Sequence, residues 1–309
     1  MKTFSVVIPT FNRKEILEKV LLEFNLQDYP KDSFEVVVVD SSSTDGTEDL
    51  LSNFNANFNF KYIIQPDKGR GGARNTGVKV AQGEYILFTD ADILPSTTLI
   101  KEHSVAHNIY PASAIVGWEV RVDSFEEYKK VLSRPPLRRE FHSPFRKRLS
   151  WLFFLTGNAS VKKEFIMKAG GFDEEFKGYG WEDVELGYRL SRAGIPIYYW
   201  RRAINFHLHP VSWQEKLMIR KMAGNSLYYF YKKHKDKKIL YLLGINPVTL
   251  LGEKLLTNLP SLKNYFHKVA SGDGIYNSII KEILLNYYYL QGFREATCFL
   301  CRESRQRNF

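Results

Sequence analysis

The feature that most constrains the fold is a regular alternation of strand-like and helix-like periodicity over residues 1–90. Apolar runs rich in β-branched residues predict buried strands at 4–10, 34–40, 60–65 and 85–90. Between them, apolar residues at helical spacing or capping residues predict helices at 13–27, 43–54 and 71–82. Strands that alternate with helices form βαβ units, so we expect an α/β fold with a mostly parallel sheet covered by helices on both faces.

The remainder of the chain is less regular. Strands are predicted at 113–122 and 195–200, and a helix that ends at a glycine is predicted at 181–194. From residue 211 the composition changes, and the stretches 212–238 and 275–293 predict amphipathic helices with aromatic faces. We therefore expect an α/β domain over 1–210 and a C-terminal α-helical extension over 211–309.

Positive charge is concentrated at the C-terminal end. The chain has a net charge of +10, and residues 201–309 carry 18 Lys and Arg against 7 Asp and Glu. Such a surplus suggests an anionic partner, which could be a nucleic acid, an anionic membrane surface or a phosphorylated acceptor. A solvated basic face explains the composition equally well. Because no nucleic-acid-binding motif is present, we expect no nucleic-acid partner.

The sequence predicts a cytoplasmic protein, with peripheral attachment to the inner face of the cell membrane as an alternative. Strand-forming residues begin almost at the first residue, with no basic-then-apolar signal segment before them. The nearest candidate for a membrane span, 239–252, is short and contains Pro247. Cys298 and Cys301 form a single CxxC near the C-terminus, so we expect two reduced thiols without a function.

Polar residues follow the predicted strands at their carboxyl ends, where ligands bind in open parallel sheets. They are Pro9, Thr10 and Asn12 after the first strand, Asp40 after the second, and Asp90 and Asp92 after the fourth. Each aspartate alone could cap a turn or a helix. Together they predict a site, and the D-x-D pattern suggests Mg²⁺ or Mn²⁺ bound with a diphosphate.

The order of several motifs resembles that of a family 2 glycosyltransferase with the GT-A fold. The matching stretches are "SVVIPTFNR", "VVVVDSSSTDGT", "GRGGARNTGVKVAQGEYILFTDAD", "TGNASVKK" and "GGFDEEFKGYGWEDVELGYRLSRAG". They cover most of residues 4–210 and end before about 215. The resemblance implies that the domain over 1–210 binds a nucleotide-diphosphate sugar and carries the catalytic residues.

The resemblance also implies roles for individual residues. Donor-binding roles fall on Pro9, Thr10, Asn12, Arg13, Asp40, Lys68, Arg74, Asp90 and Ala91. Acceptor-binding roles fall on Gly157, Asn158 and Trp181. Asp92 would bind Mn²⁺ or Mg²⁺, with His207 or His209 as a further ligand. A histidine that follows a strand more often has a structural role, so the histidine is the less specific of the predicted metal ligands.

Glu182 and Asp183 open a predicted helix, where the helix dipole keeps a carboxylate ionised. Acids in a first turn are common without any function. In inverting members of the family an acid here takes the proton from the acceptor hydroxyl. The resemblance therefore implies Asp183 as the base, with Glu182 as the second choice.

The resulting hypothesis is an inverting, metal-dependent glycosyltransferase that uses a nucleotide-diphosphate sugar, with UDP as the family's commonest carrier. The acceptor would be a hydroxyl of a glycan or of a lipid-linked sugar. A non-catalytic nucleotide-sugar-binding protein is an alternative. A nucleotidyltransferase would need a glycine- and arginine-rich loop after the first strand, and "PTFNRKE" has no glycine. A dehydrogenase is disfavoured because no G-x-G-x-x-G follows that strand.

Overall fold

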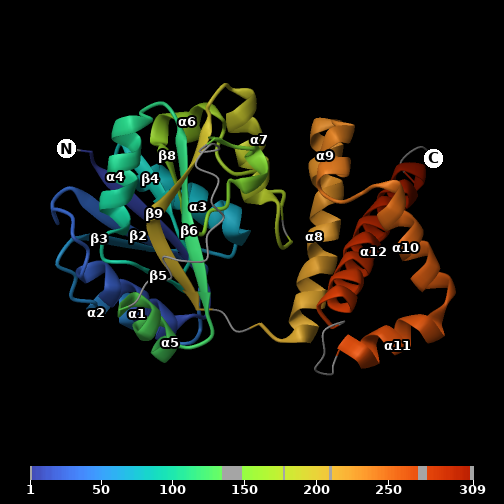
Figure 1. Cartoon of the computed structure of the whole chain (residues 1–309). Coiled ribbons are helices and arrows are strands. Elements are labelled where there is room, and N and C mark those ends of the chain that lie inside the picture. Colours follow the sequence, from blue (N-terminus) through green and yellow to red (C-terminus); the bar gives the residue numbers. More distant parts are fainter. Residues whose placement is uncertain (1, 134–147, 177, 209–210, 271–276, 307–309) are drawn as a thin grey trace. The chain divides into compact units, whose positions relative to one another are not determined.

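The computed structural model of the protein describes residues 2–133, 148–176, 178–208, 211–270 and 277–306, with side chains in the last helix up to Cys298 (Figure 1). The chain divides into two compact units. The α/β unit comprises residues 1–175 and 182–210, and the helical unit comprises residues 176–181 and 211–309. A short segment before residue 182 therefore belongs to the helical unit, although it lies within the α/β sequence.

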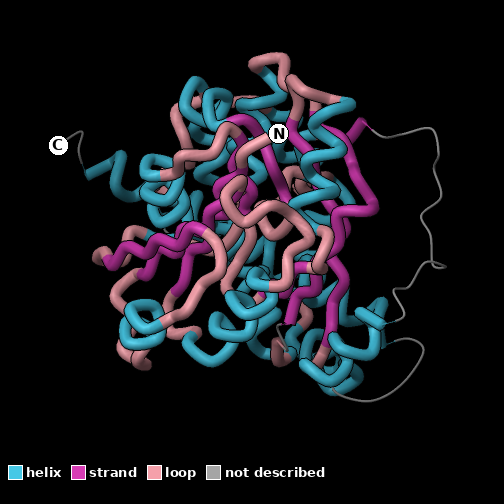
Figure 2. The backbone as a smooth tube through the Cα atoms, turned by 90° about the vertical axis from the view of Figure 1, so that its left-hand side faces the viewer, coloured by secondary structure: helices cyan, strands magenta, loops and turns pink. Residues whose placement is uncertain are grey.

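One nine-stranded sheet forms the centre of the α/β unit, in the order β3-β2-β1-β4-β8-β6-β9-β5, with β7 beside β9. The strands, drawn in magenta in Figure 2, are β1 (Phe4–Thr10), β2 (Phe34–Asp40), β3 (Asn59–Ile64), β4 (Tyr85–Phe88), β5 (Ile93–Pro95), β6 (Ala114–Val122), β7 (Arg148–Leu149), β8 (Ala159–Lys162) and β9 (Ile197–Leu208). The first four strands run parallel, as their alternation with helices predicted. β9 continues to Leu208, whereas the sequence predicted a strand that ends at residue 200.

Alternate residues of the strands face opposite layers of helices. Phe4, Val6 and Ile8 of β1 pack in the layer that contains α1, α4 and α5, and Val7 packs in the layer that contains α3, α6 and α7. These helices are α1 (Lys14–Asn25), α3 (Gly69–Val80), α4 (Leu99–Ile109), α5 (Phe125–Ser133), α6 (Lys163–Lys168) and α7 (Glu182–Arg192), with the short α2 (Thr47–Asn53) and η1 (Trp151–Phe153) in the connections. Helices thus cover both faces, and the predicted fold class is confirmed.

The helical unit contains α8 (Trp213–His234), α9 (Lys237–Leu242), α10 (Pro247–Asn258), α11 (Pro260–Ala270) and α12 (Asn277–Gln306). Ser212 and Glu215 form a capping box at the start of α8. The helices α8 and α12 approach closely where Gly224 faces Gly292. A Cβ atom on Gly224 would lie 1.9 Å from the carbonyl oxygen of Tyr289, and one on Gly292 would lie 1.9 Å from that of Lys221.

The sequence predicted α8 and α12 but not the helices between them. The apolar stretch 239–252 is divided between α9 and α10, because Asn246 caps α10 and Pro247 occupies its first turn. Within the ranges that the structure describes, no helix is both long and apolar enough to cross a bilayer.

Candidate functional site

The loops after β1 and β2 are bonded to each other at the carboxyl edge of the sheet. The backbone N–H of Asn12 donates to Oγ of Ser43 at 2.7 Å, and Oδ1 of Asn12 accepts from the N–H of Thr44 at 2.8 Å. Ser43 also donates to both carboxylate oxygens of Asp40, through its hydroxyl and its backbone N–H. The buried hydroxyl of Thr10 has no hydrogen-bond partner among the described residues. The carboxyl edge of the sheet therefore presents hydrogen-bonded polar loops, and the Thr10 hydroxyl remains available to a ligand.

Asp92 and His207 lie side by side because of the pairing between β5 and β9. Ile93, which follows Asp92, is opposite His207 in this antiparallel pair. Nε2 of His207 lies 3.6 Å from Oδ1 of Asp92, and a guanidinium nitrogen of Arg13 lies 3.4 Å from the other carboxylate oxygen. Carboxylate and imidazole are ligands that Mn²⁺ accepts, so the chemistry of this donor pair fits a divalent cation.

The pair does not extend to a larger protein cage. Within the described ranges, no group of three or more His, Cys, Asp and Glu side chains has an arrangement that could hold a metal ion. A cation bound partly through substrate phosphates needs only one or two protein carboxylates. His209, the alternative ligand, lies outside the described residues.

Glu119 of β6 is a member of this site that the sequence analysis missed. Its Oε1 lies 3.1 Å from Nδ1 of His207, so the two nitrogens of the imidazole ring have different carboxylate neighbours. Burial alone would lower the pKa of His207, but the hydrogen bonds and charges of Asp92 and Glu119 raise that pKa to about 10. A signal was present in "GWEVRV", where Glu119 stands between apolar neighbours within a predicted strand.

The other aspartate of the D-x-D turn, Asp90, belongs to a different cluster. Arg74, which is 1% exposed, lies with one terminal nitrogen 2.7 Å from Oδ1 of Asp90 and with the other 3.1 Å from Oε1 of Glu182. Burial alone would lower the pKa of Arg74, but the charges of Asp90, Glu182 and Asp183 raise it. The guanidinium therefore remains charged and links α3, the D-x-D turn and the start of α7.

Asp183 lies at this cluster without a direct bond to Arg74. Its carboxylate accepts from the backbone N–H of Val184 at 2.7 Å and is 3.5 Å from the N–H of Thr156. Burial and the neighbouring charge of Glu182 raise the pKa of Asp183 to about 7, although the charge of Arg74 acts in the opposite direction. A carboxylate with a pKa near neutrality can accept and release a proton under working conditions.

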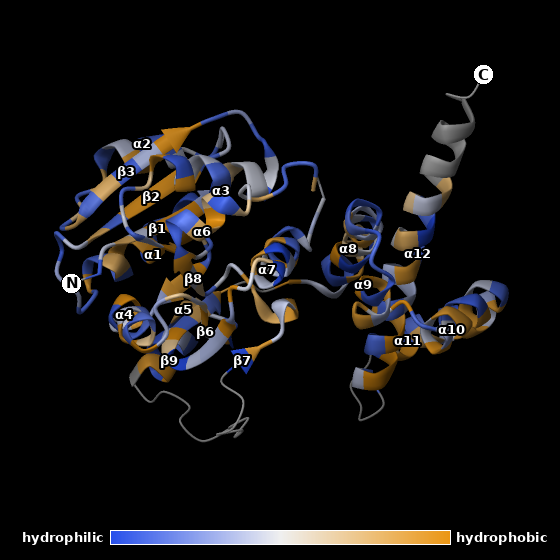
Figure 3. Cartoon of the chain, turned by 90° about the horizontal axis from the view of Figure 1, so that it is seen from above, coloured by the Kyte–Doolittle hydropathy of each residue, from blue (hydrophilic) through white to orange (hydrophobic). Residues whose placement is uncertain are grey.

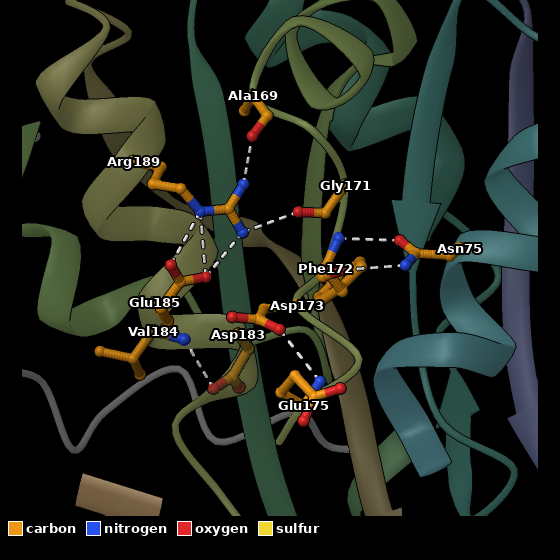
Figure 4. Close-up of polar contacts among 10 residues, drawn as sticks. All are labelled: Asn75, Ala169, Gly171, Phe172, Asp173, Glu175, Asp183, Val184, Glu185 and Arg189. Atoms are coloured by element: carbon orange, nitrogen blue, oxygen red, sulfur yellow. Dashed lines mark hydrogen bonds and ion pairs between the residues drawn. The ribbon is translucent and has the colours of Figure 1, made fainter. Parts of the chain in front are cut away.

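The helix that carries Glu182 and Asp183 is firmly attached to the loop before it (Figure 4). Arg189 pairs with the fully buried Glu185 at 2.6 Å and donates to the carbonyl oxygens of Ala169 and Gly171. The side chain of Asn75 from α3 bonds to both the N–H and the C=O of Phe172. These contacts fix the orientation of α7 relative to α3 within the α/β unit.

Two of the residues assigned to the acceptor side occupy closely packed positions. A side chain at Gly157 would displace Glu119, because a Cβ atom there would lie 2.5 Å from Oε2 of Glu119. Asn158 is 3% exposed, and its side-chain NH₂ donates to the carbonyl oxygens of Ala203 and Trp118. Gly157 thus borders the Glu119 side of the site, and the Asn158 side chain is already used by the protein.

Asn158 is also one end of a buried chain of hydrogen bonds that reaches α4. Its Oδ1 is 2.8 Å from Nε2 of His103, whose Nδ1 is 2.8 Å from Oγ of Ser160. Oγ of Ser160 is in turn 2.7 Å from Nε2 of His107. Burial lowers the pKa of His103 to about 4 and that of His107 to about 2, so both rings are neutral near pH 7.

Trp181 has a contact that its sequence context did not predict. Its indole N–H donates to the carbonyl oxygen of Ala223 at 2.7 Å, and its ring lies edge-on to Tyr289, all within the helical unit. Three further predicted residues have less specific surroundings: Pro9 lies within β1, Lys68 precedes α3, and Ala91 is buried in the D-x-D turn. Acceptor and donor roles for these four residues stay predictions.

Two family models match the chain. The model described as "Glycosyl transferase family 2" matches residues 5–170, which is more than half of the 309 residues. The model described as "N-terminal domain of galactosyltransferase" matches residues 138–210.

The curated relatives include enzymes with several different names. A validoxylamine A glucosyltransferase from Streptomyces hygroscopicus subsp. jinggangensis is 34% identical over 220 residues, which cover 62% of this chain and 52% of the relative. The uncharacterized glycosyltransferase YfnE of Bacillus subtilis is 30% identical over 67% of this chain and 65% of the relative. The chondroitin synthase of Escherichia coli is 27% identical, covering 74% and 39%. The chain thus spans between about two fifths and two thirds of the length of these relatives.

Solved structures share the fold. A mannosyltransferase from Pyrobaculum calidifontis, in complex with GDP-Man and Mn²⁺, matches 96% of this chain and 87% of its own with a TM-score of 0.64 at 20% identity. Residues 1–349 of Staphylococcus aureus TarS, in complex with UDP, match 95% of this chain and 91% of their own, with a TM-score of 0.54 at 18% identity. The family model, the fold and the ordered motifs agree, and the chain belongs to glycosyltransferase family 2.

Proposed function

We propose that the protein transfers a sugar from a nucleotide-diphosphate sugar, with UDP as the favoured carrier, to a hydroxyl group of a glycan or lipid-linked acceptor. The reaction is a single displacement that inverts the configuration at C1 of the sugar. The observation that supports it best is the D-x-D turn, whose two carboxylates serve different neighbours. Asp92 lies beside His207. Asp90 pairs with Arg74, which also pairs with Glu182.

The proposal assigns the cation to Asp92 and His207, whose oxygen and nitrogen donors suit Mn²⁺ or Mg²⁺. When bound there with the diphosphate, the cation would supply Lewis-acid stabilisation of the negative charge on the departing nucleotide. Glu119 orients the imidazole through Nδ1 and leaves Nε2 directed at Asp92. Arg74 supplies a fixed positive charge on the other side of the turn.

Asp183 serves as the base in this proposal. The acceptor oxygen forms its bond to C1 while the bond between C1 and the phosphate oxygen breaks. The electron pair of that bond leaves with the nucleoside diphosphate, and the acceptor proton passes to the carboxylate of Asp183. With a pKa of about 7, Asp183 can take up the acceptor proton and return to the ionised form near neutral pH.

The names of related proteins support a nucleotide-sugar donor and differ in the nucleotide. The Pyrobaculum mannosyltransferase was solved in complex with GDP-Man and Mn²⁺, and TarS in complex with UDP-GlcNAc. Several curated relatives are named for transfer of glucosyl or N-acetylglucosaminyl groups. These names support transfer of a sugar from a nucleotide-sugar donor, and one of the neighbouring structures contains Mn²⁺.

The decisive experiment incubates the full chain with a panel of UDP- and GDP-sugars and Mn²⁺, and follows release of the nucleoside diphosphate by chromatography. We expect turnover of at least one donor, with loss of turnover in Asp92→Asn and in Asp183→Asn. The Asp183→Asn variant should still bind the donor that the wild type uses. Asp49→Asn, an exposed acid on α2, is the matched control and should behave like the wild type.

The non-catalytic alternative gives a different result. A nucleotide-sugar-binding protein would bind one donor in calorimetry and release no nucleoside diphosphate with any acceptor. Normal turnover by Asp183→Asn would contradict its assignment as the base. Full activity of Asp92→Asn would contradict the cation site.

A further inference from the structure

Within the described residues, helix α10 has apolar side chains on a buried side and on an exposed side. Leu256 on the inner face is 3% exposed. Val248, Leu251 and Leu255, together with the C-cap residue Leu259, recur at helical spacing on a neighbouring face and are 79%, 69%, 51% and 46% exposed. A row of apolar side chains on one side of a surface helix is unusual in a protein that has no partner there.

The exposed charged side chains of α10 and α11 are all lysines, whereas α9 begins with the capping acid Asp236. The sequence 237–270 contains five lysines and one acid, Glu253. That acid is 2% exposed and lies 2.9 Å from a guanidinium nitrogen of Arg294, so it faces inward and is neutralised. Lys237, Lys238, Lys254 and Lys268 are exposed, and Lys254 stands beside Leu251 and Leu255 on the same helix. The outer surface of α10 therefore combines apolar side chains with positive charge only.

Neighbouring elements continue this composition. Tyr241 and Leu242 at the end of α9 are 69% and 50% exposed, and Tyr265 of α11 is 60% exposed. Figure 3 shows apolar residues in orange along α10 and α11. Aromatic, aliphatic and lysine side chains together are typical of helices that lie in the interface of a bilayer, with the long lysine side chains reaching the headgroups.

We propose that the outer face of α10, defined by Val248, Leu251, Lys254, Leu255 and Leu259, binds the interfacial region of an anionic lipid bilayer. The aliphatic side chains enter the boundary between headgroups and acyl chains, and the lysines meet the anionic headgroups. Charge complementarity selects this occupant. A second copy of the same basic face would bring like charges together, which opposes self-association. The proposal concerns binding alone and is independent of the proposed transfer activity.

The test measures sedimentation of the full chain with vesicles of phosphatidylcholine, with and without 30% phosphatidylglycerol. We expect binding to the anionic vesicles, at least tenfold weaker binding to the neutral ones, and a further loss at high salt. The double substitution Leu251→Ser with Leu255→Ser should weaken binding at least tenfold. Ile279→Ser changes an apolar side chain of α12 that is 61% exposed and should leave binding unchanged.

A second variant tests contact directly. Leu251→Trp places a fluorophore on the outer face of α10, and its emission should shift to the blue with anionic vesicles. Absence of a shift, or unchanged sedimentation of the double serine variant, overturns the proposal. So does a dimer in sedimentation velocity that the double serine variant dissociates, because a second copy would then cover the face.

Discussion

Oε1 of Glu119 lies 3.1 Å from Nδ1 of His207, and Nε2 of the same ring faces Asp92 at 3.6 Å. The order carboxylate, imidazole, carboxylate gives the histidine a fixed orientation toward the proposed cation. Partners that orient a metal-binding histidine typically contribute about 10- to 100-fold to metal affinity. We expect Glu119→Ala to weaken Mn²⁺ binding within this range, measured by electron paramagnetic resonance of free Mn²⁺.

The isosteric variant separates orientation from charge. Glu119→Gln retains an oxygen that accepts a hydrogen bond from Nδ1, so it should bind Mn²⁺ more tightly than Glu119→Ala. Glu48→Ala, an exposed acid on α2, is the control for loss of a carboxylate. Equal Mn²⁺ affinity in all variants would show that Glu119 has no part in the cation site.

The buried guanidinium of Arg74 predicts a large effect on stability. Replacing it with methionine leaves Asp90 and Glu182 without their positive partner at 2.7 and 3.1 Å. Removal of one member of a buried ion pair typically costs about 3–5 kcal/mol. We expect Arg74→Met to lower the free energy of unfolding by about this amount in urea titrations. Arg192→Ala, an exposed arginine at the end of the same α7, should change it by less than about 0.5 kcal/mol.

The raised pKa of Asp183 predicts that this residue destabilises the folded protein at neutral pH. An unfolded aspartate has a pKa of about 3.9, and the folded value is about 7. Between these values the folded state binds a proton that the unfolded state has lost, so stability decreases as pH rises through this window. Asp183→Asn should therefore gain at least about 1 kcal/mol of stability relative to wild type between pH 5 and pH 8. A gain that does not depend on pH would contradict the raised pKa, and Asp49→Asn should show no pH-dependent difference.

The same pKa predicts the pH dependence of catalysis. If Asp183 is the base, only its ionised form accepts the acceptor proton, so kcat/KM should increase about tenfold per pH unit below a pH of about 7 and level off above it. Initial rates in a series of buffers at constant ionic strength and fixed Mn²⁺ test this. A profile that is flat from pH 5.5 to 8 would exclude Asp183 as a base with this pKa.

The close crossing of α8 and α12 predicts that Gly224 and Gly292 tolerate no side chain. A methyl group at either position would lie 1.9 Å from a backbone carbonyl oxygen of the opposite helix. We expect Gly224→Ala and Gly292→Ala each to cost about 1–3 kcal/mol, measured by circular dichroism during thermal unfolding. Gly252→Ala in α10 is the matched control, since no atom lies within 4 Å of its added methyl group. Its higher helix propensity should raise stability slightly.

The sequence was sufficient to predict the parallel half of the sheet and the polar residues at its edge. The runs at 4–10 and 34–40 coincide with β1 and β2, because each consists of apolar residues that both faces of a covered strand require. The D-x-D turn follows directly from β4. The strands and the turn depend on residues that are neighbours in the sequence, so the pattern of a few consecutive residues is enough to predict them.

Features that depend on contacts between distant segments were missed. Glu119 contacts His207 through the pairing of β6 with β9, and the sequence does not specify that pairing. The bond from the indole N–H of Trp181 to the carbonyl oxygen of Ala223 was also missed, while the acceptor role that the resemblance implies for Trp181 stays a prediction. Helices α9 to α11 were missed because Pro247 and Pro260 divide their apolar residues into short runs.

The buried chain from Asn158 to His107 has a single order of donors and acceptors. Because the amide NH₂ must donate to Ala203 and Trp118, its oxygen must accept, and Nε2 of His103 must therefore carry the hydrogen. Nδ1 of that neutral ring then accepts from Ser160, whose oxygen accepts from Nε2 of His107. One amide group thus determines the tautomers of two histidines. A change as small as Asn158→Asp would keep an acceptor for His103, but it would place a second oxygen against the carbonyl oxygens of Ala203 and Trp118 and remove the NH₂ group that fixes this order.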